Sequence, residues 1–309
     1  MKIVFWSPVH GQTGTTSNIL ALSLVSAVSY KRKCLVTQTH FNYNNLEAPL
    51  IERNSKASPD YFLDVGIDAL VRNFKAERLN RSLVENCCIA LGDTSLSLLP
   101  GTTKTNRESF DYAVGMAVPK VFLAMEQFYD CMFIDTNPGG KELSIKLMED
   151  AELTVINLNQ NLEIIDLYFR QYDKLIPGNK FFLFGAYDAE SKYNINNLRK
   201  KYGGITKANS GVIPYNTAYK DAQADSRVVD FIKRNINVGN QNDNYYFMKK
   251  TVGAAGKILD MAEKKSGSRP GDSLEEKSRN RLEGKSGNEH PWGGRQYPWG
   301  RRGLHVHGE

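Results

Sequence analysis

The segment SPVHGQTGTTSN, residues 7–18, joins an apolar run, KIVFW at 2–6, to a helix-like run, ILALSLVSAVSYKRK at 19–33. A strand, a glycine-rich turn and a helix in this order typically form a cradle for phosphate, because the amides at the start of the helix point toward a bound anion. Such a loop normally carries a lysine, and this one has none. The segment therefore raises the question of what the cradle can bind without that charge.

The general phosphate-loop pattern is G-x-x-x-x-G-K-[ST]. With Gly14 as the second glycine, Thr15 occupies the lysine position, Thr16 the Ser/Thr position and Val9 the position of the first glycine. Gly11 and Gly14 allow tight turns, and the Thr16 hydroxyl is suited to Mg²⁺. Taken alone, a plain Gly/Thr turn that precedes a helix, with Thr16 as its N-cap, explains the segment equally well.

Short apolar runs alternate with amphipathic ones over most of the chain. Several of these runs are continuous rather than alternating in polarity, which is typical of parallel strands buried on both faces. We predict strands at 2–6, 34–38, 87–91, 96–100, 131–135, 153–157, 180–184 and 210–214. We predict helices at about 16–30, 60–74, 107–127, 141–149, 161–173, 192–202, 225–235 and 244–263. The pattern predicts an α/β fold with a mainly parallel central sheet and helices on both faces.

The composition changes after Glu263. The last residues are rich in Gly, Ser, Arg and Pro and poor in aliphatic side chains, so we expect a domain at 1–262 and a disordered tail at 263–309. Ten Lys and Arg against six Asp and Glu lie from Lys264 onward, which accounts for four of the six net positive charges. The near-neutral body argues against a strong phosphate-driven affinity for DNA, although the tail could supply one.

Cellular location is also constrained by the sequence. The four cysteines, Cys34, Cys87, Cys88 and Cys131, have no C-x-x-C spacing and lie in or beside apolar runs, which favours reduced core thiols over a zinc site. The N-terminus has no signal-peptide pattern, and no apolar run is long enough to span a bilayer. We expect a cytoplasmic protein that is not integral to a membrane.

Three further segments end predicted strands with polar residues. YDCMFIDTNPGG, 129–140, ends its strand in Asp135, which could hold a Mg²⁺-bound water opposite Thr16 or could merely cap the following helix. CLVTQTHFNYNNLE, 34–47, places a polar loop after the second strand, and GVIPYNTAYKDAQADSRVVDF, 211–231, closes a late strand with Pro214. Ligands of parallel sheets bind at these carboxyl ends.

Together these motifs resemble the MinD/ParA family of deviant Walker A ATPases, over about residues 1–262, and more narrowly its TadZ/CpaE pilus-positioning branch. The family's K-G-G-x-G-K-T-T corresponds to HGQTGTTS, 10–17, and its D-T-P-P-G to DTNPGG, 135–140. The resemblance implies a P-loop NTPase fold that binds ATP and Mg²⁺, with Thr16 and Asp135 serving the metal. It implies that the nucleotide contacts Gly11, Gln12, Thr13, Gly14, Thr15, Thr16, Ser17, Asp135 and Pro214.

This sequence departs from the family at its charged positions. The two family lysines correspond to His10 and Thr15, and the acidic pair of D-x-D-x-x-x-x-N-L-D corresponds to Gln38 and His40. Asn45, Leu46 and Glu47 keep the end of that motif, whereas the adenine-facing N-R corresponds to Gly185 and Ala186. His40 is the candidate catalytic residue, since it could orient a water, and a surface polar role is its alternative. Losing these charges predicts weak or absent hydrolysis, because hydrolysis needs stabilisation of transition-state charge.

The resemblance implies a positioning or scaffold factor, nucleotide-responsive or nucleotide-independent, that forms a homodimer and serves a pilus, secretion, conjugation or cargo-partitioning machine through protein partners. The main alternative is an active ATPase in which His10, Lys104 or Lys141 substitutes for the missing lysine. A metabolic enzyme on the same sheet is a third hypothesis, but no second-substrate constellation is visible in the sequence.

Overall fold

Strand β1 (Lys2–Trp6) lies inside the sheet because both of its faces are apolar. Ile3 and Phe5 pack into one hydrophobic core, while Val4 and Trp6 pack into another on the opposite face.

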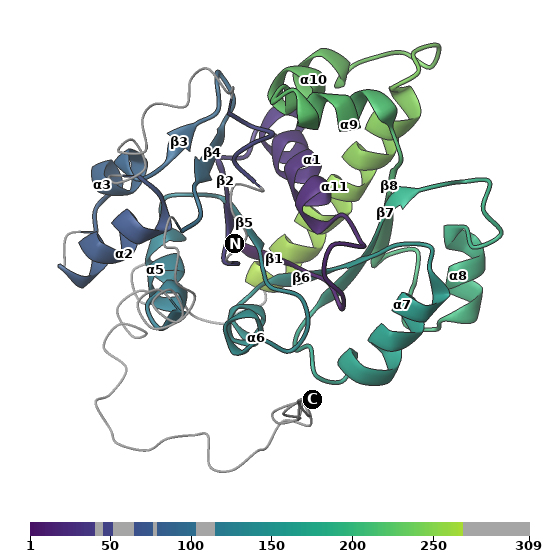
Figure 1. Cartoon of the computed structure of the whole chain (residues 1–309), viewed down its shortest axis with the longest axis horizontal. Coiled ribbons are helices and arrows are strands. Elements are labelled where there is room, and N and C mark those ends of the chain that lie inside the picture. Colours follow the sequence, from purple (N-terminus) through teal and green to yellow (C-terminus); the bar gives the residue numbers. More distant parts are fainter. Residues whose placement is uncertain (41–45, 52–64, 77–78, 103–114, 268–309) are drawn as a thin grey trace, which may run out of the picture. The chain divides into compact units, whose positions relative to one another are not determined.

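The computed structural model describes residues 1–40, 46–51, 65–76, 79–102 and 115–267, all of them within the compact unit Met1–Gly271 (Figure 1).

The sheet has eight strands in the order β3-β4-β2-β5-β1-β6-β7-β8. Every neighbouring pair is parallel except β3 and β4. This arrangement confirms the predicted, mainly parallel α/β sheet. The remaining strands are β2 (Cys34–Gln38), β3 (Ile89–Ala90), β4 (Leu96–Leu99), β5 (Cys131–Asp135), β6 (Leu153–Leu158), β7 (Lys180–Tyr187) and β8 (Ser210–Pro214).

Helices cover both faces of the sheet, as predicted (Figure 1). The core that holds Phe5 is closed by α1 (Thr15–Ser29), α9 (Thr217–Ala224), α10 (Val228–Asn235) and α11 (Tyr245–Gly267). The core that holds Trp6 is closed by α2 (Gly66–Lys75), α3 (Arg81–Asn86), α5 (Val118–Met125), α6 (Glu142–Glu149), α7 (Leu162–Leu167), the π-helix η4 (Tyr168–Tyr172) and α8 (Ile195–Lys201).

Two described helices, α3 and α9, were not predicted. Each begins at an asparagine whose side chain accepts a backbone N–H: Asn80 from Leu83 and Asn216 from Tyr219. The predicted strand at 87–91 shortens to two residues at the sheet edge. Parts of the helices predicted at 60–74 and 107–127 lie outside the described residues, as does the segment 268–309 that holds most of the predicted tail, so the domain boundary remains a prediction.

The four cysteines, all within the described residues, are thiols that form no disulfide. Cys34 faces Cys131 across the β2–β5 pair, and a hydrogen bond to Cys131, together with burial, raises the pKa of Cys34. Burial raises the pKa of Cys88 to about 12. Because the thiolate is the reactive form, the raised pKa values suit Cys34 and Cys88 to packing rather than to redox chemistry. Among the described helices, none is long and apolar enough to cross a membrane.

Candidate functional site

The turn between β1 and α1 presents backbone amides at the mouth of a helix. Gly14, with φ 67° and ψ 30°, adopts the left-handed conformation just before α1, and Gly11 also has a positive φ of 73°. The amide of Asn18 donates to the carbonyl of Gly14 at 2.9 Å, which leaves the three preceding helical amides without an acceptor in the helix. The N-cap residue Gly14 has no side chain that could cap this end, so the amides and the helix dipole favour an anion here.

Side-chain amides behind the loop hold its carbonyl groups in place. Asn18 Nδ2 donates to the Thr13 carbonyl at 3.3 Å and to Asn157 Oδ1 at 3.0 Å. Asn159 Nδ2 donates to the Gln12 carbonyl at 3.0 Å. These bonds tie the loop to β6 and its C-terminal extension. The loop is therefore preorganised, and sequence analysis missed these three asparagines.

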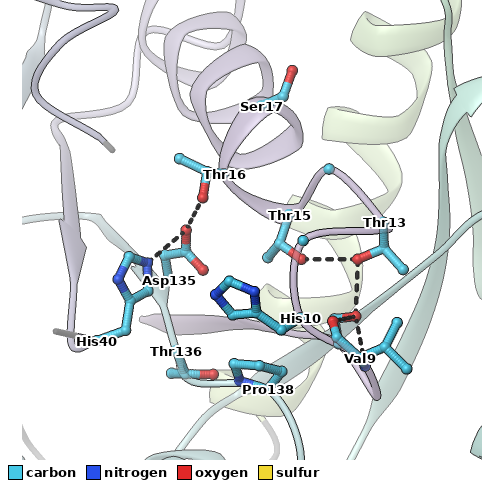
Figure 2. A pocket seen from close by; sticks show the side chains of 13 residues that line it. Val9, His10, Thr13, Thr15, Thr16, Ser17, His40, Asp135, Thr136 and Pro138 are labelled. Atoms are coloured by element: carbon cyan, nitrogen blue, oxygen red, sulfur yellow. Dashed lines mark hydrogen bonds and ion pairs between the residues drawn. The ribbon is translucent and has the colours of Figure 1, made fainter. Parts of the chain in front are cut away.

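The structure places Asp135 and Thr16 next to each other. The Thr16 hydroxyl donates to Asp135 Oδ2 at 2.7 Å, and His40 Nε2 lies 3.5 Å from the same oxygen (Figure 2). Asp135 and His40 are 2% and 6% exposed, so this cluster is almost fully buried. Thr16 lies at the start of α1, Asp135 at the end of β5, and His40 two residues after the end of β2. They open onto a cavity of about 230 Å³.

Most of the candidate residues share this one cavity. Its lining comprises Ser7, Val9, His10, Gly11, Thr13, Gly14, Thr15, Thr16, Ser17, His40, Asp135, Thr136 and Pro138 (Figure 2). Gln12 and Pro214, which the sequence also placed at the nucleotide, are not part of that lining. Glu47 is buried and accepts a 2.7 Å hydrogen bond from the amide of Gly101 beside β4, while Asn45 lies outside the described residues.

The electrostatics of the cavity are unusual for a phosphate site. Within the part of the chain that the structure describes, no lysine or arginine lines it, and its ionisable side chains are Asp135, His10 and His40. Lys141 lines a separate hollow of about 280 Å³ with Asn137 and Lys146, and Lys104 lies outside the described residues. Backbone dipoles are therefore the main positive potential that a ligand meets here.

The oxygen donors fit a hard divalent cation. A hydroxyl and a carboxylate are ligands that Mg²⁺ uses, and Mg²⁺ keeps several waters or phosphate oxygens in addition to one or two protein carboxylates. No group of three or more His, Cys, Asp or Glu that could hold a metal is found among the residues described. Thr16 and Asp135 thus suit a cation that arrives with a phosphate ligand, rather than one held by the protein alone.

Strand β7 closes the back of the loop at Gly185. The register between β7 and β8 shifts between Phe184 and Tyr187, and Ala186 has a positive φ of 45°. A Cβ at Gly185 would lie 2.5 Å from Asn18 Nδ2 and 2.8 Å from the Thr13 carbonyl oxygen. The absence of a side chain here permits the close approach of strand and loop.

Gly185→Ala is therefore expected to destabilise the protein by about 1–3 kcal/mol, because overpacking would push Asn18 and the loop apart. Chemical denaturation measures this change, and Gly203→Ala serves as the control, since a Cβ there meets nothing within 4 Å. Equal stability of the two variants would contradict the close packing of β7 on the loop.

Helix α9 is tied to the first turn of α1 by one hydrogen bond. The Tyr219 hydroxyl donates to the Ser17 carbonyl at 2.7 Å, and burial raises the pKa of Tyr219, so the phenol remains a donor. Ser17 lines the cavity, so this bond links the site to α9. This role of Tyr219 was not predicted from the sequence.

Tyr219→Phe should lower the free energy of unfolding by about 1 kcal/mol, because it leaves the Ser17 carbonyl without this donor. The control is Tyr215→Phe, whose side chain is 57% exposed. Urea denaturation of the two variants makes the comparison, and a loss of the same size in Tyr215→Phe would refute the specific role of the Tyr219 bond.

The described fold matches known protein structures, although no family model and no curated protein sequence matches the chain. It is similar to a ParA family ATPase from Chlorobium tepidum TLS (TM-score 0.62, 14% identity, 82% of this chain and 98% of that one). It is also similar to the septum site-determining protein MinD from Pyrococcus horikoshii OT3 in complex with Mg-ADP (TM-score 0.61, 16% identity, 86% of this chain and 99% of that one). A third match is the MinC:MinD cell division complex of Aquifex aeolicus (TM-score 0.57, 14% identity, 88% of this chain and 99% of that one).

These similarities define the class of fold: the chain has the P-loop NTPase α/β fold of the MinD and ParA ATPases. At identities of 14–16% the likeness establishes the fold alone, and function has to be argued from the site.

Proposed function

We propose that this chain is a MinD/ParA-type P-loop protein of the TadZ/CpaE-like branch, which binds a nucleotide with a divalent cation and hydrolyses ATP weakly or not at all. Its role is that of a positioning or scaffold factor for a pilus, secretion, conjugation or cargo-partitioning machine. The observation that carries the proposal is a cavity that keeps the helix-terminal amides, Thr16 and Asp135 while no lysine or arginine of the described chain lines it.

Binding and hydrolysis depend on different parts of this site. Ground-state phosphate binding can rest on backbone amides, the helix dipole and a metal, all of which the described geometry accommodates. Hydrolysis needs extra charge stabilisation in the transition state, and removing one such group typically costs about 10²–10³ in rate. With Thr15 and His10 in place of two lysines, the described site retains the elements for binding, but none of its described lining residues is a lysine or arginine that would assist turnover.

The partner role is inferred from the structural neighbours. MinD of Aquifex aeolicus forms a complex with MinC, and MinD of Pyrococcus horikoshii binds Mg-ADP. By analogy, we propose that nucleotide occupancy, where it occurs, biases homodimer formation and the docking of a protein partner in the cytoplasm. The basic residues after Glu263 are the proposed source of contacts with DNA.

An active ATPase is the second candidate, because His10 lines the cavity and could supply a positive charge when protonated. Steady-state phosphate release and the oligomeric mass of the full-length protein, with and without Mg·ATP, separate the two. The proposal predicts release no higher than a buffer blank and a nucleotide-dependent change in mass. Release that disappears in His10→Ala would instead support the ATPase, and the absence of any nucleotide effect at millimolar ATP would indicate a nucleotide-independent scaffold.

A further inference from the structure

We propose that the divalent cation of this site is bound by the imidazole of His40 beside Asp135, so that the site prefers Mn²⁺ and Co²⁺ to Mg²⁺. The inference rests on the proposed function for the nucleotide that accompanies the cation. The proposed ligands are Asp135 at the end of β5, His40 after β2 and Thr16 at the start of α1.

The distances between the donor atoms suit a shared cation. Two ligands about 2.1 Å from one metal lie about 3.0–3.4 Å apart, depending on whether the geometry is octahedral or tetrahedral. His40 Nε2 and Asp135 Oδ2 are 3.5 Å apart, and Thr16 Oγ1 lies 2.7 Å from the same carboxylate oxygen. A cation can therefore contact the three donors after small side-chain adjustments.

The backbone keeps His40 and Asp135 together. Gln38 and Asp135 are register partners in the parallel pair β2–β5, and the Thr39 amide donates to the Asp135 carbonyl at 2.8 Å. His40 is the next residue, and its side chain is 6% exposed. Because both side chains are buried and their backbones are joined, little ordering is needed when a cation binds.

The type of donor determines the expected preference. Mg²⁺ favours oxygen ligands and dehydrates reluctantly, whereas imidazole nitrogen suits first-row transition metals, whose affinities rise from Mn²⁺ to Co²⁺. His40 occupies a position at which the family resemblance expects an aspartate. Replacing a carboxylate by an imidazole therefore changes which cation the site prefers, as well as its charge.

The site also predicts that the cation is exchangeable. Two strong ligands, His40 and Asp135, with the Thr16 hydroxyl leave positions for water or phosphate oxygens. This agrees with the lack, in the described ranges, of a cluster of three or more His, Cys, Asp or Glu side chains that could hold a metal. The cation would thus bind weakly by itself and more tightly with a nucleoside diphosphate.

Titration of the full-length protein with Co²⁺ alone, followed by visible absorption, tests the assignment. His40→Gln should weaken Co²⁺ binding by about 10–100-fold, by analogy with the cost of disturbing ligand environments, and should change Mg²⁺ affinity far less. The control replaces His290, His305 and His307, the three histidines of the sequence that follow the described residues, by alanine, and it should keep the Co²⁺ signal. Equal losses for Co²⁺ and Mg²⁺, or an unchanged Co²⁺ affinity, would overturn the inference.

A second measurement does not depend on the folding of a variant. Pulsed electron paramagnetic resonance of Mn²⁺ bound to the unaltered protein should show coupling to a directly bound nitrogen, and a spectrum with oxygen ligands alone would contradict the proposal. Loss of that coupling in His10→Ala, with retention in His40→Gln, would refute the assignment to His40. If ADP fails to bind with either metal, the proposed nucleotide function is wrong, while the titrations with metal alone still decide the role of His40.

Discussion

Thr15→Lys is expected to raise the affinity for Mg·ADP by roughly tenfold to a hundredfold, because a hydrogen bond to a charged group contributes about 1.5–3 kcal/mol. Thr15 is the first residue of α1 and lines the cavity, so an ammonium placed there would face the bound phosphates. Isothermal titration calorimetry at constant salt measures the change.

Thr15→Met is the matched control, since methionine has a long, flexible side chain without the charge. We expect no gain of affinity in this variant. A gain of the same size in both variants would show that side-chain length, rather than charge, is what the loop lacks. No gain in either would mean that the loop does not hold phosphates against the first turn of α1.

Asp135→Asn is expected to weaken metal-dependent binding of ADP by about 10–100-fold, because it removes the one carboxylate that lines the cavity among the described residues. The substitution keeps the size of the side chain and an oxygen that can accept from Thr16. The fold should survive, since the neutral amide relieves the cost of burying a charge at a position that is 2% exposed.

Calorimetry with and without a chelator isolates the metal-dependent part of this binding, and thermal melting without ligand reports on the fold. Asp150→Asn is the control, since Asp150 caps the end of α6 and does not line the cavity. An Asp135→Asn variant that binds Mg·ADP as tightly as the parent would exclude Asp135 from the cation site.

The fold was largely predictable because buried parallel strands have a simple signal. The bounds of β1, β2, β5 and β8 match the predicted runs, since each contains a short apolar run and is followed by a polar or glycine-containing turn. Helix α9 was missed because it has no large aliphatic side chain. Its apolar residues are three alanines and Tyr219, and its start depends on the Asn216 side chain.

The site was predictable only where a linear motif carries it. The loop at 7–18 and the strand end at Asp135 have recognisable patterns, and the structure places them at one cavity. Asn18 and Asn157 pair across 139 positions of sequence, and Gly185 is required because Asn18 lies against it. Such residues have no local signature, because their role comes from proximity that the fold creates.

The central claim is that main-chain amides and a cation can hold a nucleotide here without a lysine. A crystal structure of the full-length protein with ADP and Mg²⁺ or Mn²⁺ at millimolar concentration tests it most directly. The account predicts phosphate density in the loop between Val9 and Ser17, against the amides at the start of α1, with the cation beside Thr16 and Asp135. A cavity that remains free of nucleotide, with Thr16 still hydrogen-bonded to Asp135, would contradict the account.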